Sequence, residues 1–200
     1  MKPAATLSAA DQEDGQAMAQ LAAGQGAALN RLMERHAEKL FHFLVRALQN
    51  GEDAADLAQE TFCRVYHNRA KFDPGQKFST WLYAIAANLV KDRYRYRARH
   101  PHVSLDSENP ETEAPLQERL VDPQASPSER LQSAERVAAV RQAVAALPEE
   151  LRLPLILAEY ENHSQAEIAA TLGCSIKAVE TRIYRARQRL RETLAPVLRG

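Results

Sequence analysis

The stretch SQAEIAATLGCSIKAVETRIYRARQRLR, residues 164–191, decides the fold of the C-terminal part of the chain. Ser164, followed three residues later by Glu167, has the form of a capping box, in which both side chains satisfy backbone donors at the start of a helix. Gly173 offers a left-handed exit from that helix, and Ser175 can cap a second helix directly afterwards. Two short helices joined by a tight turn that contains glycine predict a helix-turn-helix.

The second of these helices has one packed face and one outward face. At 100° per residue, apolar side chains share a narrow arc: Val179, Ile183, Ala186 and Leu190. The opposite arc carries polar and basic side chains: Lys177, Thr181, Tyr184, Arg185 and Gln188. Three more arginines flank that arc: Arg182, Arg187 and Arg189. From residue 175 to 191 there are six basic residues and one acidic residue. Such a face can neutralise phosphates and present donors to base edges in the major groove, although a solvated basic helix is the plainer alternative.

Composition limits the class of protein. The chain has 26 basic and 26 acidic residues, so a uniformly basic nucleic-acid binder is excluded, whereas segregated charge is not. Cys63 and Cys174 are the two cysteines, and neither lies in a metal-binding cluster, which disfavours a disulfide framework and fits a reducing cytoplasm. No apolar stretch is long enough to span a bilayer, and the first residues lack the basic-then-apolar pattern of a signal peptide. We expect a cytoplasmic protein without membrane insertion.

The pattern of apolar residues predicts an all-α fold of two small helical domains joined by a flexible acidic linker. The expected segments are a flexible lead at 1–10, a first domain at 11–100, the linker at 101–133 and a second domain at 134–200. The linker has seven acidic and two basic residues and no sustained apolar periodicity. In the first domain we expect helices at about 11–23, 27–49, 53–69 and from Ser79 or Thr80, as the cap, to Arg99. In the second domain, Pro154 predicts a helix start or a kink.

The last helix of the first domain has a core stripe and a stripe of small or basic residues. The core stripe consists of Leu82, Ile85, Ala86 and Leu89, and the other stripe of Thr80, Ala84, Ala87, Lys91 and Arg95, with Trp81 and Asn88 beside it. Small residues let a polynucleotide approach closely, and an asparagine offers a donor and an acceptor to a base edge. Trp81 and Tyr83 either stack on unpaired bases or are ordinary core aromatics.

An acidic face lies on the preceding helix. Asp53, Asp56, Gln59 and Glu60 fall along one side of it. Because acidic side chains repel DNA, this face is more consistent with a basic protein partner, and a merely solvated face is the alternative.

Seven short motifs carry a resemblance to a known family. Four of them resemble conserved region 2 of the extracytoplasmic-function (ECF) sigma factors of the sigma-70 family: DLAQETF at 56–62, FDPG at 72–75, FSTWLY at 78–83 and AANL at 86–89. Three resemble region 4 of these factors: LP at 147–148, EIA at 167–169 and TRIYRAR at 181–187. The resemblance covers residues 12–99 and 134–195, in the order found in that family.

The resemblance implies a transcription initiation factor with three binding surfaces. Core RNA polymerase would be bound by Asp56, Gln59, Glu60 and Phe62. The −10 promoter element would be captured, with a base flipped out, by the turn Lys71 to Lys77 together with Phe78, Ser79, Trp81, Asn88, Lys91 and Arg95. The −35 element would be read by Lys177, Thr181, Arg182, Tyr184, Arg185 and Arg187. An anti-sigma factor is the implied regulator, and no cofactor or small-molecule substrate is implied. Glu180 departs from the family, in which this position is often basic or small.

The linker length is compatible with this function. Thirty-three extended residues reach about 110 Å. Two promoter elements about 25 base pairs apart are separated by about 85 Å at 3.4 Å per step.

Two other functions compete with this interpretation. An enzyme is disfavoured because the chain lacks a glycine-rich phosphate loop, HExxH and GxSxG, so no catalytic or metal site is predicted. His36 and His42 are six residues apart and do not share a helix face, and His100 and His102 have no cysteine nearby. A free-standing helix-turn-helix regulator, acting as a dimer on a palindrome, stays open on the C-terminal half alone.

Overall fold

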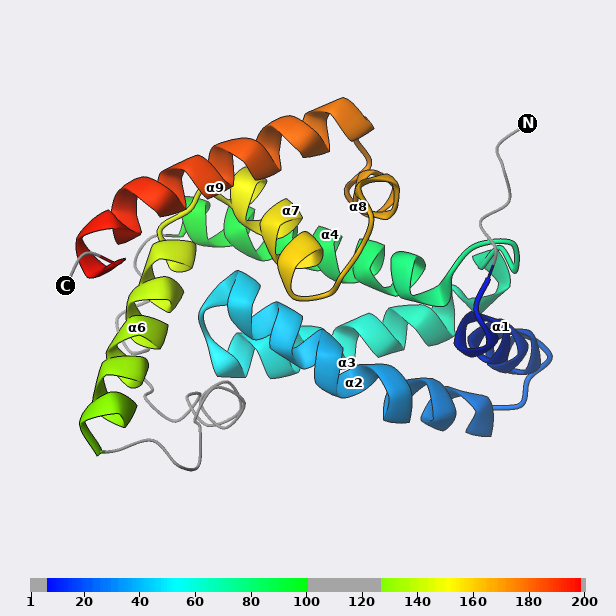
Figure 1. Ribbon diagram of the computed structural model, residues 1–200. Coiled ribbons are helices and arrows are strands. Elements are labelled where there is room, and N and C mark those ends of the chain that lie inside the picture. The colour runs from blue at the N-terminus through cyan, green and yellow to red at the C-terminus, as the bar shows by residue number, and fades with distance from the viewer. Residues whose placement is uncertain (1–6, 101–126, 199–200) are drawn as a thin grey trace.

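The computed structural model describes residues 7–100 and 127–198, and every regular element within them is a helix (Figure 1). The all-α prediction is therefore confirmed. In chain order the helices are α1 (Ala9–Ala22), α2 (Ala27–Leu48), α3 (Gly51–His67), the short 3₁₀ helix η1 (Arg69–Lys71), α4 (Phe78–Arg99), α6 (Pro127–Ala145), α7 (Glu149–Glu159), α8 (Gln165–Leu172) and α9 (Ile176–Leu198).

The N-terminal region consists of α1 to α4. The long helix α2 packs against α3 and α4, and α1 packs against the N-terminal end of α2 (Figure 1). The side chains of Phe43, Leu44 and Leu82 are fully buried between these helices, and Phe43 meets the ring of Tyr83 edge-on at a centroid distance of 5.1 Å. Burying large apolar side chains contributes roughly 1.5–3 kcal/mol each, so this core dominates the stability of the region.

Side-chain caps fix several helix starts. The Ser164 hydroxyl accepts a hydrogen bond from the Glu167 backbone N–H, and the Glu167 carboxylate accepts one from the Ser164 backbone N–H, which confirms the predicted capping box. Gly173 has a φ of 66°, the left-handed exit that glycine adopts without strain. Ser175 caps α9 through the Ala178 N–H at 3.2 Å. The predicted cap of α4 is wrong, because that helix begins at Phe78 without a side-chain cap.

Other helix boundaries also differ from the prediction. Helix α6 begins at Pro127, inside the predicted linker 101–133, since proline is favourable in the first turn of a helix. The rest of that linker, residues 101–126, lies outside the described residues. Helix α7 contains Pro154 and begins five residues before it, at Glu149.

The C-terminal region consists of α6 to α9. Helices α8 and α9 form the predicted helix-turn-helix, and α7 packs against both of them. Val179, Ile183 and Ala186 are buried on the inner side of α9, as their periodicity predicted. A small cluster of Leu147, Leu151, Leu155 and Ala186 joins α7 to α9.

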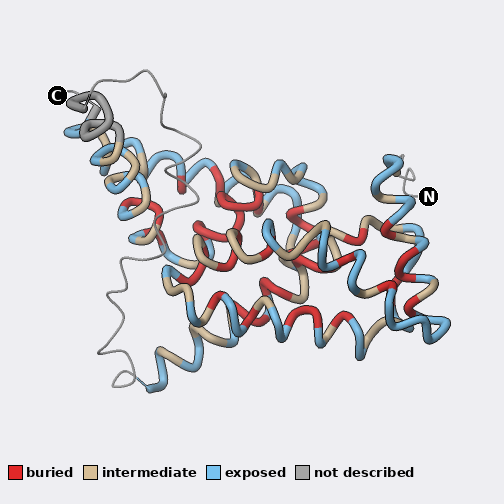
Figure 2. Tube along the Cα trace, turned by 90° about the horizontal axis from the view of Figure 1, so that it is seen from below, coloured by how far each residue is buried: buried red, intermediate tan, exposed pale blue. Residues whose placement is uncertain are grey.

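The two regions pack directly on each other. Helix α8 lies on α4, and α7 lies on α2. One buried apolar cluster runs through both regions, and it includes Phe43 and Leu82 on one side and Leu157 and Ile168 on the other. Figure 2 shows the buried segments turned inward from both regions, with exposed residues on the outside. The sequence predicted two domains but not this contact.

Candidate nucleic-acid and polymerase interfaces

The outward face of α9 is a basic and polar surface. Thr181, Tyr184 and Arg185 are exposed, Tyr184 to 68 %, while the opposite face of the helix is buried. The hydroxyl of Thr181 donates to the Lys177 carbonyl at 2.9 Å, which orients its methyl group and oxygen along the helix. These side chains lie where the predicted arc placed them. An exposed helix face of this composition fits the major groove of DNA.

Two of the predicted cations form ion pairs with acidic side chains. Arg187 is exposed and donates two hydrogen bonds to Glu159, at 3.0 and 2.6 Å. The Lys177 ammonium lies 3.9 Å from the Glu180 carboxylate, and Arg182 is half-buried. Such exposed pairs contribute little and exchange easily for a phosphate.

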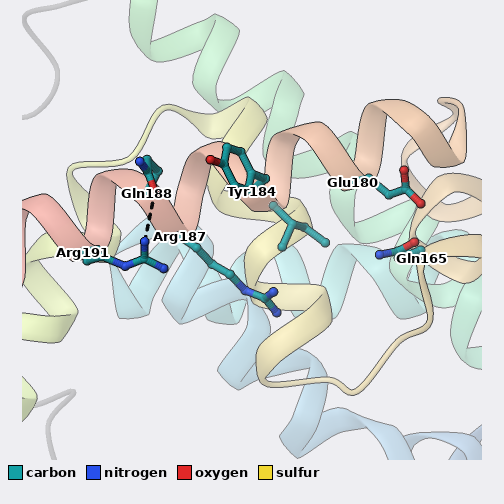
Figure 3. A pocket seen from close by; sticks show the side chains of 7 residues that line it. Gln165, Glu180, Tyr184, Arg187, Gln188 and Arg191 are labelled. Atoms are coloured by element: carbon teal, nitrogen blue, oxygen red, sulfur yellow. Dashed lines mark hydrogen bonds between the residues drawn. The ribbon is translucent and has the colours of Figure 1, made fainter.

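A shallow groove runs along the edge of this face, on the side of α9 that meets α8 (Figure 3). It is lined by Gln165, Glu180, Ile183, Tyr184, Arg187, Gln188 and Arg191. Arg191 donates to the Gln188 amide oxygen at 3.3 Å. Gln165 and Arg191 were not predicted as site residues. Gln165 comes from α8, so only the tertiary fold brings it to this face.

A second groove opens beside α4. Its lining combines two cations, two amides and an indole: Arg64, Asn68, Lys71, Trp81, Ile85 and Asn88. Asn88 and Lys71 are exposed, whereas Trp81 is half-buried. This combination suits an unpaired base, since the indole offers a stacking face and the amides offer donors and acceptors. Arg64 lies in the last turn of α3 and Asn68 directly follows that helix; both were missed because they precede the predicted turn, which begins at Lys71.

Trp81 is held in place by two phenylalanines. Its ring lies 5.3 Å from that of Phe72 and 6.3 Å from that of Phe78, measured between centroids. Phe78 is fully buried, so the prediction that it contacts DNA does not fit the structure. Phe78 is a core residue that packs against Trp81 and supports its position. Ser79 is half-buried at the start of α4.

The predicted cations of α4 do not lie on one free surface. Lys77 forms an ion pair with Glu167 of α8 at 2.7 Å, and the Lys91 ammonium donates to the Leu172 carbonyl at 3.4 Å. Arg95 is exposed and pairs with Asp92 at 2.9 Å. Lys77 and Lys91 therefore contact the C-terminal region, although both remain half-exposed.

The acidic face of α3 is only partly free. Asp56, Gln59 and Glu60 are exposed, and Glu60 pairs with Arg64 at 2.8 Å. Phe62 is 4 % exposed and belongs to the core, so it does not fit the predicted contact with a partner. Asp53 is half-buried and does not belong to the free face either, because its carboxylate forms ion pairs with Arg93 and Arg97 of α4. The exposed part of this face consists of Asp56, Gln59 and Glu60.

The pKa of Glu167 is lowered to about 2. Partial burial raises the pKa, but hydrogen bonds from Lys77 and from the Ser164 side chain and backbone outweigh this effect. A carboxylate with a depressed pKa stabilises the fold above the unfolded-state pKa near 4.5 and loses this contribution as the pH falls toward 2.

A pH titration tests this assignment. We expect the Glu167 side-chain carboxyl resonance in an NMR titration to show a midpoint well below 4.5, and Lys77→Ala to raise that midpoint because an ion pair is lost. The advantage of the wild type over Glu167→Gln in unfolding free energy should be full at pH 7 and should shrink below pH 4.5. An unchanged midpoint in Lys77→Ala would show that the two side chains do not pair in solution.

Neither a metal site nor a disulfide is found among the described residues. Among residues 7–100 and 127–198, no group of three or more His, Cys, Asp or Glu side chains is arranged to hold a metal ion. Cys63 and Cys174 are both free thiols. No helix within the described part of the chain is long and apolar enough to cross a membrane.

Comparison with known proteins gives the same family for both regions. Residues 32–100 match the family model of sigma-70 region 2, and residues 138–190 match that of sigma-70 region 4. The chain is 32 % identical to the RNA polymerase sigma-H factor of Pseudomonas aeruginosa over 188 residues, which cover 94 % of this chain and 97 % of that protein. It is 34 % identical to the ECF RNA polymerase sigma factor SigW of Bacillus subtilis over 176 residues, covering 88 % and 93 %.

Two solved structures share the fold. The structure of CnrH in complex with the cytosolic domain of CnrY matches with a TM-score of 0.66 and 29 % identity, over 92 % of this chain and 98 % of that chain. A sigma factor RpoE from Bartonella quintana, solved with the anti-sigma factor NepR, shares the fold at a TM-score of 0.63 and 22 % identity, over 83 % of this chain and 96 % of that chain. Two family models in the expected order and two relatives matched over nearly their whole length establish that this chain belongs to the ECF RNA polymerase sigma factors of the sigma-70 family.

Proposed function

We propose that the chain binds core RNA polymerase through the exposed part of the α3 face, reads the −35 element with the outer face of α9, and holds an unpaired base of the −10 element in the groove beside α4. The observation that supports this proposal is the presence of two separate surfaces of different composition. One is a basic helix face suited to duplex DNA, and the other is an indole-and-amide groove suited to a single strand.

Strand opening then draws on binding energy alone. A base that leaves the duplex loses stacking and pairing, and the groove compensates through Trp81 and Asn88. The protein itself makes and breaks no covalent bond, needs no cofactor, and acts in the cytoplasm where the polymerase is.

Run-off transcription tests both DNA surfaces. With core polymerase and a candidate promoter, we expect a transcript only when this protein is added. Arg185→Ala removes a donor to the −35 element and Asn88→Ala removes one to the −10 element, and each should lower the yield roughly 5- to 150-fold, as the loss of a bidentate base contact of about 1–3 kcal/mol predicts. Arg31→Ala, an exposed arginine on α2, is the matched control and should leave the yield unchanged.

The outcomes separate the two surfaces. A transcript that survives Arg185→Ala but not Asn88→Ala would remove the −35 assignment alone. Tight DNA binding without core polymerase, together with no transcript from any promoter, would favour an independent regulator.

We also propose that a protein inhibitor of the anti-sigma type controls the chain. The related CnrH was solved with the cytosolic domain of a second protein, CnrY, bound to it. Affinity purification of the tagged chain from its own host should recover an additional protein besides polymerase. Recovery of polymerase alone under every growth condition would contradict this proposal.

A further inference from the structure

A buried acidic side chain joins α1 to α2. Asp14, in the middle of α1, is 4 % exposed. Its carboxylate accepts a hydrogen bond from the Nε2 atom of His36 at 2.7 Å and lies 3.0 Å from the guanidinium of Arg35. The ring nitrogen is the donor in this pair, because an ionised carboxylate only accepts. Both partners come from α2, so this carboxylate ties the two helices together.

A charge at this position costs stability unless it is paired. An apolar side chain would fill the same helix contact without that cost. Arg35 does not need Asp14 for its neutralisation, because it also pairs with the exposed Glu13 at 2.9 Å. What Asp14 adds is a fixed acceptor for the His36 ring. The arrangement therefore points to a role in orienting that ring.

The His36 ring is the first of a chain of aromatic contacts. Its side chain is 16 % exposed, and it meets the ring of Phe78 edge-on at a centroid distance of 5.1 Å. Phe78 in turn lies 6.1 Å from Phe72 and 6.3 Å from Trp81, and the last two rings are 5.3 Å apart. Because edge-on and tilted packing depends on the orientation of both rings, fixing the first ring restricts those after it.

These rings lie at the two ends of the turn that leads into α4. Phe72 directly follows η1, and Phe78 is the first residue of α4. Helix α1 packs on η1 and on α4, beside this turn (Figure 1). Trp81 lines the groove beside α4, whereas Asp14 and His36 are not among the residues that line it. The wall of the groove that the indole forms therefore rests on α1 through this buried pair.

We propose that Asp14 and His36 are positioning residues for the capture of an unpaired base. They hold the indole of Trp81 in the orientation that stacking requires, without touching the DNA. Because the indole is oriented before the strand arrives, little binding energy is lost in ordering it. The effect on transcription rests on the proposed function, whereas the effect on the position of the indole does not.

Tryptophan fluorescence of the full chain tests the positioning. Trp81 is the single tryptophan of the sequence, so the quenching of tryptophan emission by acrylamide reports on this side chain alone. Asp14→Ala releases the His36 ring and should increase the quenching toward the value of the unfolded chain. His36→Gln should have the same effect, because its amide can still donate to Asp14 but no ring meets Phe78.

Glu13→Ala is the matched control. Glu13 precedes Asp14 on α1 and pairs with the same Arg35, but its side chain is 64 % exposed. Its removal should leave the quenching unchanged. Thermal unfolding of each variant gives the temperatures at which the folded proteins are compared. If Asp14→Ala does not fold, His36→Gln decides alone. Wild-type quenching in a folded Asp14→Ala or His36→Gln protein would overturn the positioning.

Single-round run-off transcription with core polymerase tests whether the position of the indole matters. Asp14→Ala should lower the transcript yield roughly 5-fold, as is typical of residues coupled through one packed network. If Asp14 acts through the indole, the double variant Asp14→Ala, Trp81→Ala should give no less transcript than Trp81→Ala alone. Glu13→Ala should give the wild-type yield.

The outcomes distinguish this proposal from the proposed function. Losses that add in the double variant would overturn the positioning role, because Asp14 would then act by a route that does not include Trp81. A full yield from Trp81→Ala would contradict the placement of an unpaired base in the groove. In that case the quenching of Trp81 still decides whether Asp14 and His36 hold the indole in place.

Discussion

Replacing Glu60 by lysine is expected to abolish binding to core RNA polymerase, and run-off transcription with it. Glu60 is exposed on α3 beside Asp56 and Gln59, which together form the free part of the acidic face. A lysine there meets a basic partner surface with like charge, which costs several kcal/mol at an interface. A loss of about 3 kcal/mol corresponds to roughly 150-fold weaker binding.

The substitution should leave the fold intact. The Glu60–Arg64 ion pair spans one helical turn at 2.8 Å, and its side chains are 47 % and 42 % exposed. Exposed pairs of this kind contribute about 0.3–0.5 kcal/mol, a small part of the stability of a domain. The thermal midpoint of Glu60→Lys should therefore stay close to that of the wild type.

Glu38→Lys on α2 is the matched control. Like Glu60, Glu38 is an exposed glutamate with a basic residue four positions later. Its carboxylate lies 3.7 Å from the Nε2 atom of His42. This variant should bind the polymerase as the wild type does in a pull-down with core enzyme. Equal losses in the two variants would mean that net charge, rather than the α3 face, governs binding.

The helix-turn-helix was predictable from the sequence because its signals are local. The capping box at Ser164, the glycine at 173 and the 100° periodicity of α9 each depend on a few neighbouring residues. The exposed side chains of Thr181, Tyr184 and Arg185 accordingly lie on the arc that the periodicity gave them. The family was also predictable from the sequence, because its motifs are short and occur here in the order found in the family.

The role of individual motif residues was less predictable. Phe62 and Phe78 stand within family motifs, and the resemblance assigned both to binding surfaces, yet both are buried. A motif match does not distinguish a side chain that touches a partner from one that positions its neighbour. For an aromatic residue on a helix, the packing of the other helices decides between these roles.

The covering of α4 could not be predicted from the sequence at all. The stripe of Thr80, Ala84, Ala87 and Lys91 was interpreted as a nucleic-acid surface, and nothing local contradicts that interpretation. Its partner α8 begins 85 residues after Thr80. A contact at that distance in sequence depends on the shapes of two folded regions, which composition and periodicity do not encode.

The second large effect is expected for Phe78→Ala, which should destabilise the N-terminal region. Phe78 is fully buried, and its ring meets those of His36 at 5.1 Å and Phe72 at 6.1 Å. Truncating a buried phenylalanine to alanine costs about 3–5 kcal/mol, because transfer energy is lost and a cavity remains. The total stability of a domain is about 5–15 kcal/mol. The thermal midpoint should fall by roughly 6–20 °C in a chain of this size.

Comparing Trp81→Ala with Phe78→Ala tests whether Phe78 positions Trp81 or contacts DNA itself. Trp81 is half-buried and lines the groove beside α4, so its removal should lower the transcript yield while costing less stability than Phe78→Ala. Both variants are compared by thermal unfolding and by run-off transcription at a temperature where each is folded. If Phe78 acts by positioning the indole, its variant loses stability and transcript together. A Phe78→Ala protein that keeps the wild-type thermal midpoint but gives no transcript would instead make Phe78 a direct DNA contact. Such a contact requires the floor of the groove to open in solution.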